Sequence, residues 1–146
     1  MKHLIINADD FGLSPGVNQG IVEAYQAGGI SSTTVMVNMP GFTDAVRLAS
    51  LHPGLGVGLH FNLTYGRPVS DPRLIPSLIQ ADGRFHSIGG NCNRELRDIE
   101  IELSAQWGRL VGSAHGLWLA SDSPGWASPS AAGFSERVRS YGTVGS

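Results

Sequence analysis

Short apolar runs alternate with amphipathic segments along the first sixty residues of the chain. Apolar or β-branched runs predict three strands, over residues 2–7, 32–38 and 55–60, and the first is centred on a buried Leu4-Ile5-Ile6. Apolar residues at helical spacing predict two helices between them, over residues 14–28 and 42–52, and Ser14-Pro15 starts the first. Strands that alternate with helices through short links predict the α/β class with parallel strands.

The second half of the chain loses this alternation. Residues 71–90 are rich in Pro and Gly and predict a loop, whereas residues 93–110 predict a third helix. That helix is expected to bury one apolar stripe and to carry its charges elsewhere; the stripe is Leu96, Ile99, Leu103, Trp107 and Leu110. From residue 112 onward Gly, Ala, Ser and Pro dominate without a period of 2 or 3.6, which predicts an irregular tail.

Composition narrows the class of protein. Ten basic against twelve acidic residues give a net charge of −2 without a basic stripe, so we expect no nucleic-acid partner. No apolar run approaches the roughly 18 residues of a spanning helix, and the acidic Asp9-Asp10 come too early for a signal peptide, so a cytoplasmic location is expected. The single Cys92 excludes an internal disulfide and a cysteine metal cluster. A homo-oligomer is compatible with the sequence.

Acidic and imidazole side chains follow two of the predicted strands. Asp9-Asp10 come after the first and His60 ends the third, so all three are expected on the rim formed by the carboxyl ends of parallel strands. Adjacent carboxylates repel, and a divalent cation would stabilise them, with one acid as ligand and the other as base toward an activated water. The alternative is that Asp9-Asp10 form a turn and His60 is a core residue. A phosphate-receiving receiver domain is excluded, because it needs an aspartate where His60 stands.

Three separated strings carry a family resemblance: Asn7-Ala8-Asp9-Asp10-Phe11-Gly12-Leu13-Ser14, Ser31-Ser32-Thr33-Thr34 and Gly58-Leu59-His60-Phe61-Asn62-Leu63-Thr64. In this order they resemble the motifs of the YdjC-like carbohydrate deacetylases, and the resemblance covers residues 2–111. It implies the N-terminal portion of a distorted (β/α) barrel that removes N-acetyl groups from an amino sugar or oligosaccharide with a divalent metal.

The resemblance also implies roles for single residues. Asp9 would be the general base, and Asp10 and His60 would be metal ligands. The sugar site would be lined by Phe11, Phe61, Asn62 and Thr64. The family favours Mg²⁺, whereas an Asp/His ligand set suits Zn²⁺ equally. Asn7 either orients Asp9 or only ends the strand.

The third family motif, Pro-Thr-His-Leu-Asp-(Ser/Gly)-His-His-His, is expected near residues 121–129 and would supply a further metal histidine. The chain instead has Ser-Asp-Ser-Pro-Gly-Trp-Ala-Ser-Pro-Ser over residues 121–130. Codons for these residues exist that, read one base later, encode Pro-Thr-His-Leu-Asp-Gly-His-His-His. We therefore expect a shift of reading frame within residues 111–120, so that residues 1–111 form a partial deacetylase domain and residues 112–146 an out-of-frame tail.

A complete barrel of this type needs roughly 250 residues. We expect the shorter chain to leave an unpaired strand edge and an open apolar sheet face, and to be a poor enzyme or none. Two other functions remain open: an inactive remnant that at most binds a metal, and a different metal-dependent hydrolase such as a phosphoesterase. The phosphoesterase would need more than one cationic group near the rim, where the sequence offers little beyond Arg67.

Overall fold

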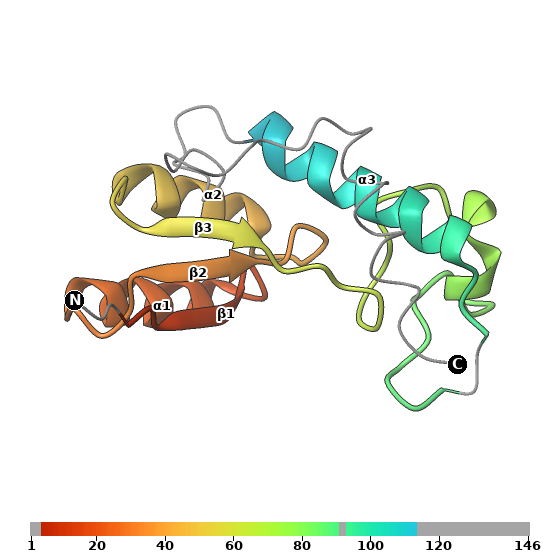
Figure 1. Cartoon of the computed structure of the whole chain (residues 1–146), viewed down its shortest axis with the longest axis horizontal. Helices are drawn as coiled ribbons and strands as arrows, with labels where there is room; N and C mark the ends of the chain where they lie inside the picture. Colours follow the sequence, from red (N-terminus) through yellow and green to blue (C-terminus); the bar gives the residue numbers. More distant parts are fainter. Residues whose placement is uncertain (1–3, 91–92, 114–146) are drawn as a thin grey trace.

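A computed structural model describes residues 4–90 and 93–113 of the chain (Figure 1). Three parallel strands form a sheet in the order β1-β2-β3, with bounds Asn7–Phe11, Ser32–Val35 and Gly56–Leu59. Helix α1 (Pro15–Gln26) connects the first two strands and α2 (Phe42–Leu51) connects the second and third. The predicted α/β class with parallel strands is confirmed. Among the described residues, no helix is both long enough and apolar enough to cross a membrane.

The first strand lies further along the chain than predicted. Leu4, Ile5 and Ile6 were expected at its buried centre, but 84%, 74% and 49% of their surface is exposed. The neighbouring strand explains the difference, because β2 begins at Ser32 and pairs with Asn7, so residues 4–6 run past the start of the sheet. Asp9 and Asp10 consequently lie inside β1 rather than in the loop after it.

The sequence signals at both ends of α1 predicted its bounds correctly. The Ser14 hydroxyl accepts a hydrogen bond from the Val17 N–H at 3.3 Å, and Pro15 is the first helical residue. The chain then leaves the helix through Gly28, whose φ of +73° suits glycine. Helix α2 and strands β2 and β3 also lie within their predicted ranges, although β2 ends at Val35 instead of Asn38.

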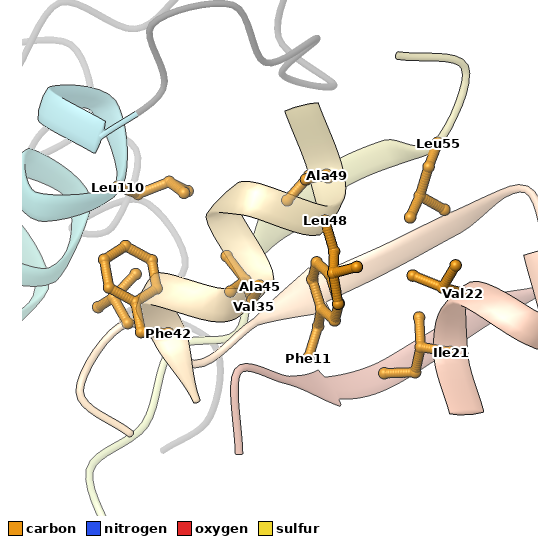
Figure 2. Packing of buried hydrophobic residues seen from close by; sticks show 12 residues of the cluster. Phe11, Ile21, Val22, Val35, Phe42, Ala45, Leu48, Ala49, Leu55 and Leu110 are labelled. Atoms are coloured by element: carbon orange, nitrogen blue, oxygen red, sulfur yellow. The ribbon is translucent and has the colours of Figure 1, made fainter. Parts of the chain in front are cut away.

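Both connecting helices pack on one face of the sheet (Figure 2). The buried cluster joins strand residues, above all Phe11, Val35 and Val57, to Ile21 and Val22 of α1. From α2 it takes Ala45, Leu48 and Ala49. Each large apolar side chain buried in this way stabilises the fold by about 1.5–3 kcal/mol.

The opposite face of the sheet is polar, contrary to the apolar face that was expected. Asn7, Asp9, Ser32 and Thr34 point away from the helices, because strand side chains alternate between faces. In β3 the same face carries Gly56 and Gly58. The uncovered side of the sheet is therefore lined by hydroxyl, amide and carboxylate groups.

Helix α3 (Leu96–Ser113) crosses from the loops after β3 to the start of α2, where Arg109 lies over the Phe42 ring (Figure 1). Its predicted apolar stripe is only partly correct, since Leu96 is 54% exposed while polar side chains are buried. The buried residues of α3 are Asp98, Glu102, Leu103, Gln106 and Leu110. The polar ones hydrogen-bond the backbone of the neighbouring loops, and Asp98 and Glu102 also accept from the Ser77 and Ser70 hydroxyls, which explains why this helix face is not apolar throughout. The predicted tail from residue 112 lies outside the described residues after residue 113.

The predicted loop over residues 71–90 contains two short 3₁₀ helices, Pro72–Leu74 and Pro76–Leu78. A small second core of Ile75, Leu78 and Phe85 anchors it, and Ile99 and Ile101 of α3 pack against that core. The loop is therefore an ordered layer that α3 holds beyond the carboxyl ends of the strands.

Candidate active site

Asp9 lies on the uncovered sheet face, and one of its carboxylate oxygens accepts two hydrogen bonds. Its Oδ1 accepts a hydrogen bond from Asn7 Nδ2 at 2.9 Å and another from Thr34 Oγ1 at 2.7 Å. Asn7 therefore hydrogen-bonds Asp9, and it begins β1 rather than ending the strand; that it orients Asp9 stays a prediction. Asp9 remains solvent-accessible, as a group that exchanges protons with water or substrate must be.

An irregularity in β1 sends the two neighbouring carboxylates in different directions. Ala8 pairs with Thr33 and Phe11 with Val35, so two residues of β1, Asp9 and Asp10, face the single Thr34 of β2. Asp10 has a φ of +67°, alone among the described non-glycine residues in being positive. Such a conformation costs on the order of 1–3 kcal/mol and is typical of functional sites.

The strained Asp10 meets His60, the residue directly after β3. The Asp10 N–H donates to His60 Nδ1 at 3.3 Å, and Asp10 Oδ1 lies 3.4 Å from the same nitrogen. Because β2 separates β1 from β3, this contact spans the end of the middle strand. The sheet end therefore brings Asp10 and His60 together, as predicted from their order along the chain.

The donor set suits a divalent cation in part. A half-exposed carboxylate and an imidazole that is 30% exposed lie side by side, and both are group types that bind Mg²⁺ or Zn²⁺. Within residues 4–90 and 93–113, no group of three or more His, Cys, Asp or Glu side chains is placed to hold a metal. Asp10 and His60 are therefore two neighbouring side chains that could each supply a ligand to a divalent cation.

The predicted sugar-lining residues differ in their placement. Phe11 is fully buried in the main core, and Asn62 is 4% exposed with its amide donating to Asn38 Oδ1 and to the Tyr65 carbonyl. Both side chains therefore organise the structure around the site, and their burial does not support a sugar contact. Phe61 and Thr64 are half-buried, and their contact with a sugar stays a prediction.

A pocket of about 400 Å³ lies on the loops that follow β2 and β3. It is lined by Asn38, Met39, Pro40, Tyr65, Gly66, Arg67 and Arg84. Tyr65 is 63% exposed, and two arginines line the same pocket, of which Arg84 has its Nε 3.6 Å from Asp82 Oδ2. The sequence did not indicate a role for Arg84. The neighbouring Phe85 N–H donates to the Gly66 carbonyl, and this contact between residues far apart in the chain brings Arg84 to the pocket.

Buried polar side chains of α3 hold these loops by their backbone. Gln106 accepts from the Asn62 N–H and donates to the Asn62 carbonyl at 2.7 Å. Glu102 accepts from the N–H groups of Val69 and Ser70 at 2.9 and 3.0 Å. The spacing of Asp98, Glu102 and Gln106, four residues apart, is the sequence signal for this polar face.

Comparison with known proteins agrees with the motifs. The model of the family described as YdjC-like protein matches residues 3–117. A carbohydrate deacetylase of Brevibacillus brevis is 52% identical over 111 residues, which cover 75% of this chain and 44% of the relative. A chitooligosaccharide deacetylase of Serratia marcescens is 45% identical over 116 residues, with the same two coverages.

A solved structure supports the fold independently. An Enterococcus faecalis protein, provisionally named for cellobiose-phosphate cleavage, superposes with a TM-score of 0.71 at 33% identity. The match covers 77% of this chain and 45% of that protein. The chain thus spans less than half the length of the relatives it matches, and within that span it belongs to the YdjC-like family.

Proposed function

We propose that this chain carries the N-terminal part of the site of a metal-dependent carbohydrate deacetylase, which hydrolyses the N-acetyl group of an amino sugar. The observation that carries the proposal is the convergence of Asp10 and His60 beside Asp9, whose Oδ1 is held by two donors. The names of the Brevibacillus and Serratia relatives support the reaction class.

Asp9, Asp10 and His60 have different proposed roles. Asp10 and His60 would hold the cation, which when bound polarises the amide carbonyl and makes water more acidic. Asp9 takes the proton of the attacking water through Oδ2, because Oδ1 already accepts two hydrogen bonds. We propose Mg²⁺ as the cation, with Zn²⁺ as the alternative that the same ligands allow.

A third protein ligand is needed for this chemistry, and the out-of-frame motif over residues 121–130 is our proposed origin for it. We accordingly propose that the 146-residue chain releases little or no acetate by itself. An enzyme with the complementary half should be active.

The test joins residues 1–111 of this chain to the part of the Brevibacillus deacetylase that follows its matched region. We expect the metal-loaded fusion to release acetate from N-acetylglucosamine oligomers. Asp9→Asn should reduce that rate at least about 100-fold and leave metal affinity within about threefold, since general-base catalysis contributes about 10²–10⁴. Asp71→Asn, at a partly exposed loop position that pairs with Arg73, is the matched control and should leave the rate unchanged.

A folded, metal-loaded fusion without acetate release would contradict the proposal, and so would full activity of Asp9→Asn. Release of phosphate from sugar phosphates, without acetate release, would instead favour the phosphoesterase.

The pocket lined by Arg67 and Arg84 supports a finer proposal on the substrate. Two arginines that line the pocket together with the exposed Tyr65 suit a sugar that carries an anionic substituent, because guanidinium binds phosphate and carboxylate strongly and the ring can stack on a sugar face. Arg84 also lies 3.6 Å from Asp82 Oδ2 in an exposed ion pair, which an anionic substituent would have to displace or share. The Enterococcus relative is named for a phosphorylated disaccharide, which agrees with this chemistry. The pair also meets the phosphoesterase's requirement for a second cation near the rim, so the acetate and phosphate assays have to be run together.

A further inference from the structure

Three consecutive hydroxyl side chains of β2 each donate a hydrogen bond to β1. Ser32 Oγ donates to Asn7 Oδ1 at 2.8 Å, and Thr33 Oγ1 donates to the Ala8 carbonyl at 2.7 Å. Thr34 Oγ1 donates to Asp9 Oδ1, also at 2.7 Å. These residues form the Ser-Thr-Thr part of a sequence motif to which the reaction assigns no role.

The three bonds fall on different faces of the sheet. Thr33 is 1% exposed on the face covered by the helices, so its bond to backbone joins the two strands there. Ser32 and Thr34 lie on the uncovered face together with Asp9. Only these two can act on the carboxylate.

Two hydrogen-bond paths lead from β2 to Asp9 Oδ1. Thr34 donates directly to Asp9 Oδ1, whereas Ser32 holds the Asn7 amide oxygen and thereby presents Asn7 Nδ2 to that same Oδ1. The irregularity in β1 makes the direct route available, because it sets Asp9 beside Thr34 and leaves Asp10 to face His60. Two donors on Oδ1 fix both the χ1 rotamer of Asp9 and the rotation of its carboxylate, and they leave Oδ2 as the oxygen open to a proton.

We infer that Thr34, together with Asn7 held by Ser32, is a positioning residue that aims Asp9 Oδ2 at the reacting water. The inference rests on the proposed role of Asp9 as general base. It assigns a task to each exposed hydroxyl of the motif and separates the carboxylate that moves a proton from the neighbouring one that would hold the metal.

The first experiment measures kinetics of the fusion enzyme with Thr34→Val, which keeps the side-chain shape and removes the donor. We expect kcat to fall about 10- to 100-fold, the penalty of a misaligned base, with KM within about twofold. Thr34→Ser restores the hydroxyl and should recover kcat to within about threefold. Thr33→Val is the matched control, because it loses an interstrand hydrogen bond of the same length without touching Asp9.

The second experiment needs no activity. In the 146-residue chain, three-bond NMR couplings to the Asp9 carboxyl carbon report its χ1 rotamer. We expect one rotamer in the unchanged chain and in Thr34→Ser, and a mixture in Thr34→Val.

A Thr34→Val protein with unchanged kcat and one Asp9 rotamer would overturn the inference, and so would a loss of kcat that Thr33→Val reproduces. Failure of the proposed function would show itself separately, as activity that survives Asp9→Asn.

Discussion

Glu102 provides the most direct test of how the site loops are held. Its side chain is fully buried, and its two oxygens serve different loop residues. Oε1 accepts from the Val69 N–H and from Gln106 Nε2, while Oε2 accepts from the Ser70 N–H and hydroxyl. In Glu102→Gln an NH₂ group replaces one of these oxygens. Whichever it replaces, one backbone N–H then faces a donor.

The magnitude follows from that geometry. A buried donor left without an acceptor costs about 1–3 kcal/mol, and the second donor on the same oxygen adds to this. The neutral amide is easier to bury than the carboxylate, which offsets part of the loss. We therefore expect Glu102→Gln to lower the free energy of unfolding by about 2 kcal/mol.

Urea unfolding followed by circular dichroism at 222 nm measures this difference at neutral pH. Glu23→Gln is the matched control, since the Glu23 side chain is exposed on α1 and accepts a hydrogen bond from the exposed Gln19, and it should change stability by less than about 0.5 kcal/mol. Equal stabilities of the two variants would refute the reasoning that Glu102 holds the backbone of residues 69–70.

Further predictions concern charge, substrate and coding sequence. Hydrogen bonds from Arg73 lower the pKa of Asp71 from 3.8 to about 2. The Asp71 carboxylate should therefore stabilise the fold above pH 4, and this contribution should shrink as the pH falls toward 2. The difference in unfolding free energy between Asp71→Asn and the unchanged chain, taken at several pH values, measures it. In the fusion enzyme, Arg67→Gln and Arg84→Gln should each raise KM at least about threefold for a 6-phosphorylated chitobiose and leave KM for chitobiose nearly unchanged; equal effects on both substrates would remove the anionic subsite. Sequencing of the coding DNA over residues 105–146 should show Pro-Thr-His-Leu-Asp-Gly-His-His-His one base out of frame, whereas any other codons there would exclude the frame shift.

The elements that the sequence predicted well are those whose signals are local. Ser14-Pro15 starts α1 and Gly28 follows its end because capping and backbone freedom depend on adjacent residues. The first strand was misplaced because Leu4-Ile5-Ile6 have strand-forming side chains, while the strand's true position depends on where β2 begins. That information lies 25 residues away in the pair formed by Asn7 and Ser32.

In the candidate site, too, some features could be predicted from the sequence and others depended on contacts between distant residues. The order of strands along the chain was enough to predict that Asp10 and His60 would meet. The different orientations of Asp9 and Asp10 could not be predicted, because they arise from one extra residue in the pairing of β1 with β2. The buried acids of α3 were missed since a charged residue in a helix is exposed far more often than it is buried.

The hydrogen bonds between α3 and the loop backbone have a consequence for how the proposed substrate preference could change. Glu102 and Gln106 bind N–H and carbonyl groups, which every residue type except proline supplies in the same form. Between these points the Asn38 and Asn62 side chains bind the backbone of residues 64, 65 and 67, so the side chains of Tyr65 and Arg67 take no part in these hydrogen bonds. In the proposed sugar pocket, substitutions at Tyr65 and Arg67 should therefore change substrate preference without loss of the hydrogen bonds that hold the loop.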